Sequence, residues 1–487
     1  MSLDILSEIR ANALFREKCF IDGGWVGADG DEWIAVDNPA NGETIGQVPR
    51  LGRHETRRAV EAAGRAWPDW REQTAEARGA ILYRWYELML EHEQTLATIM
   101  TLEQGKTWSE SVGEIRYAAS FLKWFAEEAR RAYGRTIPAA APDQHIVVLR
   151  QPAGVTAAIT PWNFPSSMIT RKAAAALAAG CPMVVKPASA TPFSALALAV
   201  LAAEAGVPAG VFNVVTGSAA EIAAEMTANP LVRKISFTGS TQVGSALMRE
   251  SAENIQKISL ELGGNAPFLV FDDADLDAAV EGAIAAKFRN TGQTCVCVNR
   301  FYVQDGVYDA FVAKLKDRVE RLELGDGMNP ESDVTPLIDQ AAADKVLAQI
   351  EDAIEQGAIL ITGGRRDPRG ENYVLPTLLT EIQQSMRVMR EETFGPLVAV
   401  SRFIDEAEAI EMANDTPFGL AAYFYSENVR RVWRVAEAIE AGMIGINTGL
   451  ISNAAAPFGG VKASGLGREG AIEGLDEYLE TKYVLMG

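Results

Sequence analysis

Residues 154–186 read GVTAAITPWNFPSSMITRKAAAALAAGCPMVVK, and this stretch decides the fold class. Its first part, from Gly154 to Thr160, is apolar and partly β-branched, which predicts a buried strand. Pro165 predicts the start of a helix and Gly180 the residue just past its end, because proline suits the first helical turn and glycine the position after the last. Met183–Lys186 is then a second short strand. A strand, a helix and a strand in this order are typical of a parallel sheet.

The same alternation continues along the chain. We expect three more strands, at 211–215, 234–237 and 257–262, separated by helices at 192–206, 219–228 and 241–252. A second α/β series follows from residue 266, with helices at 308–322 and 340–356 and strands at 359–361, 397–403 and 443–446. Helical patterns at 53–66 and 75–102 come before both series. The prediction is an α/β protein that combines a doubly wound parallel sheet with a second α/β domain.

Composition and charge exclude several classes of function. The net charge of −20 over 487 residues would repel nucleic acid and anionic lipid. The apolar run 194–207 is too short to cross a bilayer, and residues 1–10 lack the pattern of a secretory signal. Four cysteines do not form a disulfide framework in so long a chain, and the three scattered histidines do not suggest a metal site. We therefore expect a cytoplasmic protein with a small-molecule ligand, and with no nucleic acid, membrane or metal partner.

Cys295 is the most informative candidate for chemistry. It lies among small and polar residues in the segment NTGQTCVC, 290–297. A lone free cysteine is most often a small buried apolar residue, and that is the simpler interpretation of one cysteine. A polar, partly exposed environment instead favours the thiolate, which is the nucleophilic form. Motifs elsewhere in the chain favour this second interpretation.

These motifs fall where predicted strands end, at the edge where open parallel sheets bind ligands. Asn163 suits an oxyanion donor, although alone it is more simply a turn residue. Lys186 suits a ribose or phosphate, or is a solvated surface lysine. Glu261, followed by two glycines, suits a general base better than a surface carboxylate. Residues 237–244, FTGSTQVG, join a strand to a helix whose N-terminus suits a phosphate, although they lack the dinucleotide fingerprint.

Taken together, these motifs resemble the aldehyde dehydrogenase superfamily over nearly the whole chain. The motifs that carry the resemblance are PWNFP 161–165, FTGST 237–241, ELGG 261–264, GQTC 292–295, EETFGP 391–396 and PFGG 457–460. Four segments are most similar to the succinate-semialdehyde dehydrogenase branch: MITRK 168–172, KFRNTGQTCVC 287–297, GLIS 449–452 and KASGLGREG 462–470.

The resemblance implies a mechanism. Cys295 is expected to attack the aldehyde carbon, and the Asn163 side chain with the Cys295 backbone N–H to hold the oxyanion. Glu261 is expected to activate the water that hydrolyses the thioester. The residues implied in cofactor binding are Trp162, Lys186, Ser189, Gly239, Ser240, Leu262, Glu392 and Phe394. Because many NAD-preferring relatives have at position 189 a glutamate that would repel a 2′-phosphate, the neutral Ser189 predicts NADP as the preferred cofactor, with NAD possible.

The resemblance also implies a substrate. Arg171 and Arg289 match carboxylate-binding arginines, Ser452 their serine partner, and Phe458 is expected to wall the pocket. This favours oxidation of succinate semialdehyde to succinate. Glutarate semialdehyde and general aliphatic aldehydes stay open, because one methylene changes binding by only about 1–3 kcal/mol. A non-catalytic dinucleotide-binding protein and an esterase are the alternatives from other classes.

The resemblance also implies how the chain is divided into domains. Residues 1–136 and 156–265 are predicted to form the dinucleotide-binding domain, and 266–455 the catalytic domain. The extended segments 137–155 and 470–487 are predicted to be oligomerisation strands of a homodimer or homotetramer. Cys297 is a candidate redox switch, because it lies two residues after Cys295 and the pair could form a strained, reversible disulfide.

Overall fold

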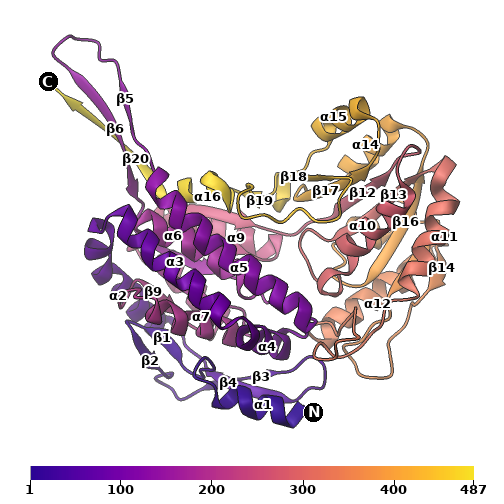
Figure 1. The fold of residues 1–487 in the computed structure, drawn as a ribbon, viewed down its shortest axis with the longest axis horizontal. Helices are drawn as coiled ribbons and strands as arrows, with labels where there is room; N and C mark the ends of the chain where they lie inside the picture. The colour runs from indigo at the N-terminus through magenta and orange to yellow at the C-terminus, as the bar shows by residue number, and fades with distance from the viewer. Residues whose placement is uncertain (1) are drawn as a thin grey trace.

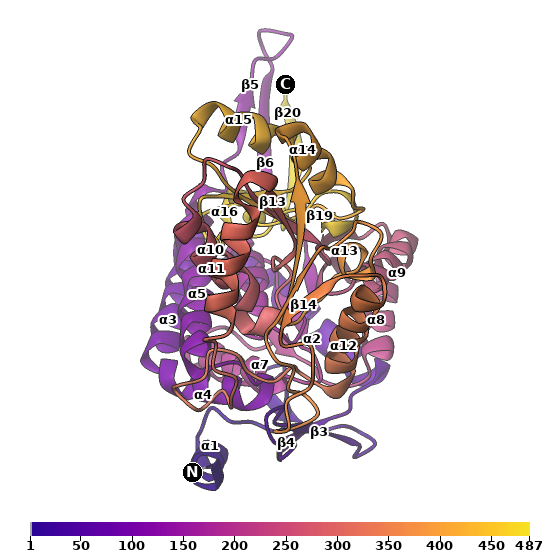
Figure 2. The same cartoon turned by 90° about the vertical axis from the view of Figure 1, so that its right-hand side faces the viewer.

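The computed structural model describes residues 2–487 and shows two large lobes with a narrow arm (Figures 1 and 2). One lobe is built on an eight-stranded sheet and the other on a seven-stranded sheet, while the arm is a three-stranded sheet. The sequence-based prediction of an α/β fold is confirmed. No helix within residues 2–487 is both long enough and apolar enough to cross a membrane.

The first sheet contains the predicted parallel strands. Its order is β19 (Gly465–Leu466), β11 (Lys257–Glu261), β10 (Val232–Thr238), β7 (Val155–Ile159), β8 (Met183–Lys186), β9 (Phe212–Val214), β1 (Cys19–Ile21) and β2 (Gly24–Val26). The five strands from β11 to β9 are all parallel to their neighbours. From β7 the strands that come next in the chain, β8 and β9, are added on one side, and the later strands β10 and β11 on the other. The switch point of the sheet therefore lies between β7 and β10.

Helices cover both faces of this sheet. On one face lie α6 (Ser167–Ala179) and α7 (Pro192–Glu204), with α3 (Ala75–Glu91), α4 (Glu93–Gln104) and α5 (Trp108–Glu128) packed outside them. On the other face lie α2 (Arg53–Glu72), α8 (Ala219–Ala228) and α9 (Thr241–Ser251). Every residue of α6 is buried, because this alanine-rich helix lies between the sheet and the outer helices.

The second lobe has a sheet that is parallel except at one edge. Its order is β14 (Ile359–Thr362), β15 (Thr377–Thr380), β16 (Leu397–Phe403), β13 (Val298–Gln304), β12 (Ala266–Val270), β17 (Ala421–Tyr425) and β18 (Met443–Ile446). Only β14 pairs antiparallel with its neighbour. The helices of this lobe are α10 (Leu276–Phe288), α11 (Tyr308–Val319), α12 (Gln340–Glu355), α13 (Arg387–Arg390), α14 (Glu406–Asn414) and α15 (Val429–Ala438). Two apolar clusters hold helices against its two faces.

The arm joins segments that are far apart in the sequence. It consists of β5 (Arg135–Ile137), β6 (His145–Pro152) and β20 (Leu479–Met486), with β6 in the middle. It projects from the first lobe and carries the C-terminus near its tip (Figure 1). The remaining elements are α1 (Ser2–Ala11), the hairpin of β3 (Trp33–Asp37) and β4 (Thr44–Pro49), and α16 (Ala471–Asp476) before β20.

Three details differ from the sequence-based expectation. The helical pattern at 75–102 is two helices, α3 and α4, which meet at His92. The short strands β1 to β4 precede the first predicted helical pattern, in a segment for which no element was predicted. Strand β19 pairs with β11, so a C-terminal segment completes the first sheet. The predicted domain boundaries at 136, 156, 265 and 455 stay a prediction.

Candidate active site

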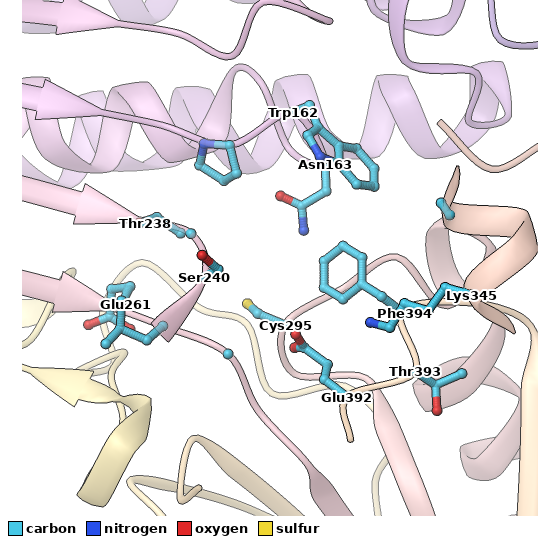
Figure 3. Close-up of a pocket in the computed structure, with 15 residues that line it drawn as sticks. Trp162, Asn163, Thr238, Ser240, Glu261, Cys295, Lys345, Glu392, Thr393 and Phe394 are labelled. Atoms are coloured by element: carbon cyan, nitrogen blue, oxygen red, sulfur yellow. The ribbon is translucent and has the colours of Figure 1, made fainter. Parts of the chain in front are cut away.

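The carboxyl ends of β7, β10 and β11 meet at the switch point of the first sheet, as the fold class requires. Together with segments of the second lobe they line a cavity of about 290 Å³. The predicted site residues in its lining are Trp162, Asn163, Gly239, Ser240, Glu261, Leu262, Cys295, Glu392 and Phe394. Figure 3 shows the Asn163 amide directed toward the Cys295 side of this cavity. Residues from both lobes therefore form one site.

Cys295 is presented by a strained turn between α10 and β13. Asn290 and Thr291 adopt left-handed backbone conformations, with φ of 51° and 56°. Hydrogen bonds hold this conformation: Asn290 Nδ2 donates to Asn163 O at 3.0 Å, and Thr291 Oγ1 donates to Thr335 O at 3.1 Å. Such strain persists where the surroundings fix it, and it is common at active sites. The turn also needs Gly264, because a Cβ there would lie 2.5 Å from Cys295 O.

The folded environment of Cys295 disfavours the thiolate. The side chain is half-buried, and removal of the thiol from water raises its pKa to about 12, although the charge of Arg171 acts in the opposite direction. The expectation that its polar sequence neighbours make the thiolate easy to form is therefore wrong for this state. The reason is that the folded protein packs Cys295 against an apolar cluster of the second lobe, which its sequence neighbours do not reveal.

Asn163 is held in place by its side chain and its main chain. The residue is buried, and its Nδ2 donates to Gln293 O at 3.0 Å. An amide nitrogen carries two hydrogens, so a second N–H is left for the cavity. The carbonyl of Asn163 accepts from Lys106 Nζ at 2.7 Å and from Asn290 Nδ2 at 3.0 Å. A rigid donor that faces a nucleophile suits an oxyanion site.

Glu261 is the last residue of β11 and is only 2% exposed. Within residues 2–487, neither carboxylate oxygen has a hydrogen-bond partner. Burial, and then the negative charge of Glu469, raise the pKa of Glu261 well above its usual range. Arg171 and Lys172 both form ion pairs with Glu469 next to it. A carboxyl group with a raised pKa and no partner suits proton transfer.

The predicted substrate residues fall into two groups. Arg289 Nη1 lies 3.4 Å from Ser452 Oγ, and both residues line a second cavity of about 510 Å³. Among the residues that the structure describes, Arg289 has no carboxylate partner within ion-pair distance. Arg171 lines neither cavity: it is buried, paired with Glu469, and lies 4.2 Å from the centre of the Phe458 ring. The charge of Arg289 is thus free for a ligand, whereas Arg171 is already engaged with Glu469.

The predicted cofactor residues lie around the 290 Å³ cavity and beyond it. Glu392 Oε1 accepts from Gly264 N at 3.0 Å, and the rings of Trp162 and Phe394 meet edge-on with centroids 5.6 Å apart. Ser240 Oγ accepts from Val243 N and caps the N-terminus of α9. These positions combine an apolar wall with free backbone donors at a helix start, which suits a dinucleotide.

Lys186 and Ser189 lie outside the lining of that cavity, at the end of β8. Burial lowers the pKa of Lys186 to about 8. Its ammonium has no acceptor or ion-pair partner within the part of the chain that the structure describes. The Lys186 ammonium is therefore available for a ligand, and a nucleotide that extends from the switch point across β8 would contact it. The residues present therefore fit a nicotinamide dinucleotide.

Cys297 does not line the cavity that holds Cys295. It is buried, and its Sγ lies 3.5 Å from Lys287 O and 3.4 Å from Val298 O, so its single S–H can donate to either carbonyl. All four cysteines are free thiols. A disulfide with Cys295 would break both contacts of Cys297, and the proposed redox switch stays a prediction.

Some lining residues were not predicted. Thr238, Gly263 and Thr393 lie in the quoted motifs, so their position beside the predicted residues was a usable signal. Lys345 reaches the cavity from α12, which contains none of those motifs, and only the packing of the second lobe brings it there.

Comparisons with known proteins agree with this geometry. The sequence model of the aldehyde dehydrogenase family matches residues 25–484. The glutarate-semialdehyde dehydrogenase of Pseudomonas aeruginosa is 60% identical, over 99% of this chain and 99% of its own. The NADP(+) succinate-semialdehyde dehydrogenase of Escherichia coli is also 60% identical, over 97% of this chain and 98% of its own. A crystal structure of an E. coli NADP-dependent enzyme superposes with a TM-score of 0.97 at 60% identity, covering 97% of this chain and 98% of that one.

Proposed function

The chain belongs to the aldehyde dehydrogenase family, and on that basis we propose that it oxidises succinate semialdehyde to succinate with NADP. The observation that carries the substrate proposal is the free charge of Arg289 beside Ser452. Asn163 and Phe164 are consecutive residues, one lining the cavity of Cys295 and the other the cavity of Arg289. A short molecule with an aldehyde at one end and a carboxylate at the other matches this arrangement.

In the proposed reaction the Cys295 sulfur bonds to the aldehyde carbon, the carbonyl electrons move to oxygen, and the thiol proton leaves to solvent or a nearby base. The free N–H of Asn163 and the Cys295 backbone N–H donate to the oxyanion. When bound, the nicotinamide supplies the acceptor for the hydride that this carbon loses. Glu261 then takes a proton from the water that hydrolyses the thioester, which releases the acid and restores the thiol.

The decisive experiment measures the near-ultraviolet absorbance of reduced cofactor formed by purified, reduced protein with succinate semialdehyde, in parallel with NADP and NAD. Rapid formation of NADPH is the expected result. If a neutral aldehyde is oxidised and succinate semialdehyde is not, the substrate proposal is wrong and the family chemistry remains.

Glutarate semialdehyde is the second candidate substrate. The Pseudomonas aeruginosa relative, which is 60% identical to this chain, is named a glutarate-semialdehyde dehydrogenase. The two acids differ by one methylene, which changes the binding free energy in a pocket by only about 1–3 kcal/mol. The ratio of kcat/KM for the two acids decides between them, and we expect both to be oxidised.

Replacing Arg289 with alanine should raise KM for succinate semialdehyde about 10- to 100-fold, with little change for butanal. The reason is that a hydrogen bond to a charged group contributes about 1.5–3 kcal/mol, and only the acid uses it. Arg289→Lys, which keeps the charge but loses the planar fork, should fall between the two. Equal losses on both aldehydes in steady-state kinetics would contradict the role.

The predicted role of Arg171 at the substrate carboxylate stays a prediction, because the residue lines neither cavity, and its removal has a second consequence. It would leave Glu469 buried with Lys172 as its single ion-pair partner within residues 2–487. The Arg171→Ala variant is therefore expected to lose stability in addition to raising KM, and thermal unfolding separates the two effects.

Replacing Ser189 with glutamate should lower kcat/KM for NADP about 100-fold while leaving that for NAD unchanged or higher. A carboxylate about 4 Å from a 2′-phosphate costs a few kcal/mol near a protein surface. Ser189→Ala, which adds no charge, is the matched control and should change either value little. A wild-type protein that uses NAD as well as or better than NADP would contradict the proposed preference.

We also propose that the arm pairs with another copy of the chain in a homodimer or homotetramer. Its exposed apolar side chains are Ile137, Tyr483 and Leu485 on one face, and Leu149 and Met486 on the other. A three-stranded sheet gains stability when exposed apolar side chains of this kind are covered. A monomeric mass in solution would contradict this. The proposed compartment is the cytoplasm, where Cys295 stays reduced.

A further inference from the structure

Lys106 is a buried cation in the tight connection between α4 and α5. Gly105 ends α4 in a left-handed conformation with φ of 91°, and Thr107 caps the start of α5. Lys106 N donates to Gln104 Oε1 at 2.9 Å, and Trp108 N donates to Gly327 O at 2.8 Å. These contacts fix the backbone on both sides of Lys106, and its side chain is fully buried.

The ammonium of Lys106 is directed at the main chain of Asn163. Its Nζ donates to Asn163 O at 2.7 Å and to Glu114 Oε2 at 2.6 Å, and it lies 4.0 Å from the centre of the Phe164 ring. An ammonium has three N–H groups, so two hydrogen bonds and one ring contact account for all of them. Lys106 lines the second cavity, but it has no N–H left to bind the carboxylate of a substrate.

Glu114 contacts the other end of the loop that begins at Asn163. Its second oxygen, Oε1, accepts from Ser166 N at 3.0 Å and from Ser167 N at 3.1 Å, at the start of α6. The Lys106–Glu114 pair therefore holds the loop 163–167 before and after Phe164. The Phe164 ring also contacts Arg289, whose guanidinium carbon lies 4.8 Å from the ring centre.

We propose that Lys106 is a positioning residue for the oxyanion site: it holds the main chain of Asn163, so that the free N–H of the Asn163 amide stays directed at the reacting oxygen. This rests on the function proposed for Asn163. Without Lys106, Asn163 O would keep the Asn290 amide as a donor and Glu114 would keep Ser166 N and Ser167 N, but the link between Glu114 and the Asn163 carbonyl would be lost. The amide would then move relative to Cys295, and an oxyanion donor is effective only within a narrow range of positions.

The test is a double-mutant cycle of Lys106→Met and Asn163→Ala, because alanine keeps the carbonyl that Lys106 holds and removes the amide. Two reactions are measured: oxidation of succinate semialdehyde with NADP, and hydrolysis of p-nitrophenyl acetate without cofactor. In both, an oxyanion forms when Cys295 attacks. Lys106→Met should lower kcat at least about tenfold in the wild-type background, a part of the 100- to 1000-fold that one oxyanion donor contributes. In the Asn163→Ala background, Lys106→Met should lower kcat by less than about threefold.

Lys106→Met leaves the buried Glu114 without its cation, so the cycle is repeated with Lys106→Met/Glu114→Gln, in which no buried charge is left alone. Lys234 provides a matched control. It is also fully buried, its Nζ lies 2.9 Å from Glu477 Oε2, and it lies 5.2 Å from the centre of the Tyr478 ring. Lys234→Met/Glu477→Gln should keep the wild-type kcat for both reactions, whatever happens to the thermal midpoint.

Equal losses in both backgrounds would overturn the proposal, because Lys106 would then act independently of Asn163. A loss as large in the Lys234 control would reduce the effect to general destabilisation, and a change confined to KM for the acid would make Lys106 part of the carboxylate site. The protein could instead hydrolyse the ester with the expected pattern of mutant effects and yet reduce no NADP. This result would refute the proposed function and leave the inference on Lys106 standing. Absence of both reactions in the wild type would overturn both.

Discussion

Replacing Cys295 with alanine should abolish aldehyde oxidation and ester hydrolysis together, with a loss of at least about 10⁴-fold in kcat. Every covalent step of the proposed reaction needs the sulfur, and Cys295 is the cysteine that reaches the cavity shared with Asn163 and Glu261. The side chain is half-buried, so the smaller alanine removes little packing and should leave the thermal midpoint nearly unchanged. Binding of NADP, followed by quenching of tryptophan fluorescence, should also be retained.

Cys181 and Cys297 are the matched controls for this variant. Both are buried and lie outside the cavity lining. Cys181→Ala and Cys297→Ala should keep most of the activity, although each removes a buried thiol and its hydrogen bond to a carbonyl. If Cys295→Ala kept its activity and Cys297→Ala lost it, the nucleophile would have been assigned to the wrong residue.

The raised pKa of Cys295 adds a pH dependence to the same prediction. Burial raises the pKa of Cys295 far above neutral pH, so the thiolate fraction of the free protein should rise about tenfold for each pH unit from neutral to alkaline pH. The rate of ester hydrolysis should therefore increase steadily from neutral to alkaline pH. A rate that is already constant at neutral pH would mean that binding of the ester, or a base next to the sulfur, removes the proton.

Much of this site could be predicted from the sequence, because its residues follow strands that the sequence marks clearly. Asn163 follows β7 after a short turn and Glu261 is the last residue of β11, and parallel strands bring their carboxyl ends to one edge. The motifs around Cys295 then fix a second set of residues by resemblance. Local patterns and short motifs were sufficient for these positions.

Contacts between distant segments could not be predicted in this way. Arg171 and Glu469 are almost 300 residues apart, and nothing in either segment indicates that they form a buried ion pair. Lys106 comes just after a helical pattern and looks like an ordinary lysine between helices, yet its ammonium contacts Asn163 O. The pKa of Cys295 likewise depends on the folded cavity rather than on its sequence neighbours. Each of these features arises from packing of whole elements, which a local pattern does not specify.

Replacing Glu261 with glutamine should separate the two halves of the reaction. Attack by Cys295 and loss of the hydride do not need the Glu261 carboxylate, whereas hydrolysis of the thioester does. The variant should form one NADPH per active site in a rapid burst, and then continue about 100- to 10,000-fold more slowly than the wild type. Stopped-flow absorbance measures both phases, and mass spectrometry of the quenched variant should find the acyl group on Cys295.

Several structural features sharpen the Glu261 prediction. Because the Glu261 carboxyl is buried and without a hydrogen-bond partner among residues 2–487, glutamine should leave the thermal midpoint unchanged or higher. Glu103 is the matched control: it is also fully buried, but it accepts from Phe193 N and Ser194 N at 2.7 and 2.8 Å, away from the cavity. Glu103→Gln should keep the steady-state rate, whatever its stability.

The pH dependence of the slow phase gives the final check on Glu261. Its pKa is raised, and a general base works only when ionised, so hydrolysis by the wild type should become faster as the pH rises through that raised value. The Glu261→Gln variant has no group to ionise at this position, and the rise should disappear. If the burst itself were lost in this variant, Glu261 would act in the attack by Cys295 rather than in hydrolysis. If the variant showed no burst and a normal steady rate, another group would be the base, and the raised pKa of Glu261 would reflect its burial alone.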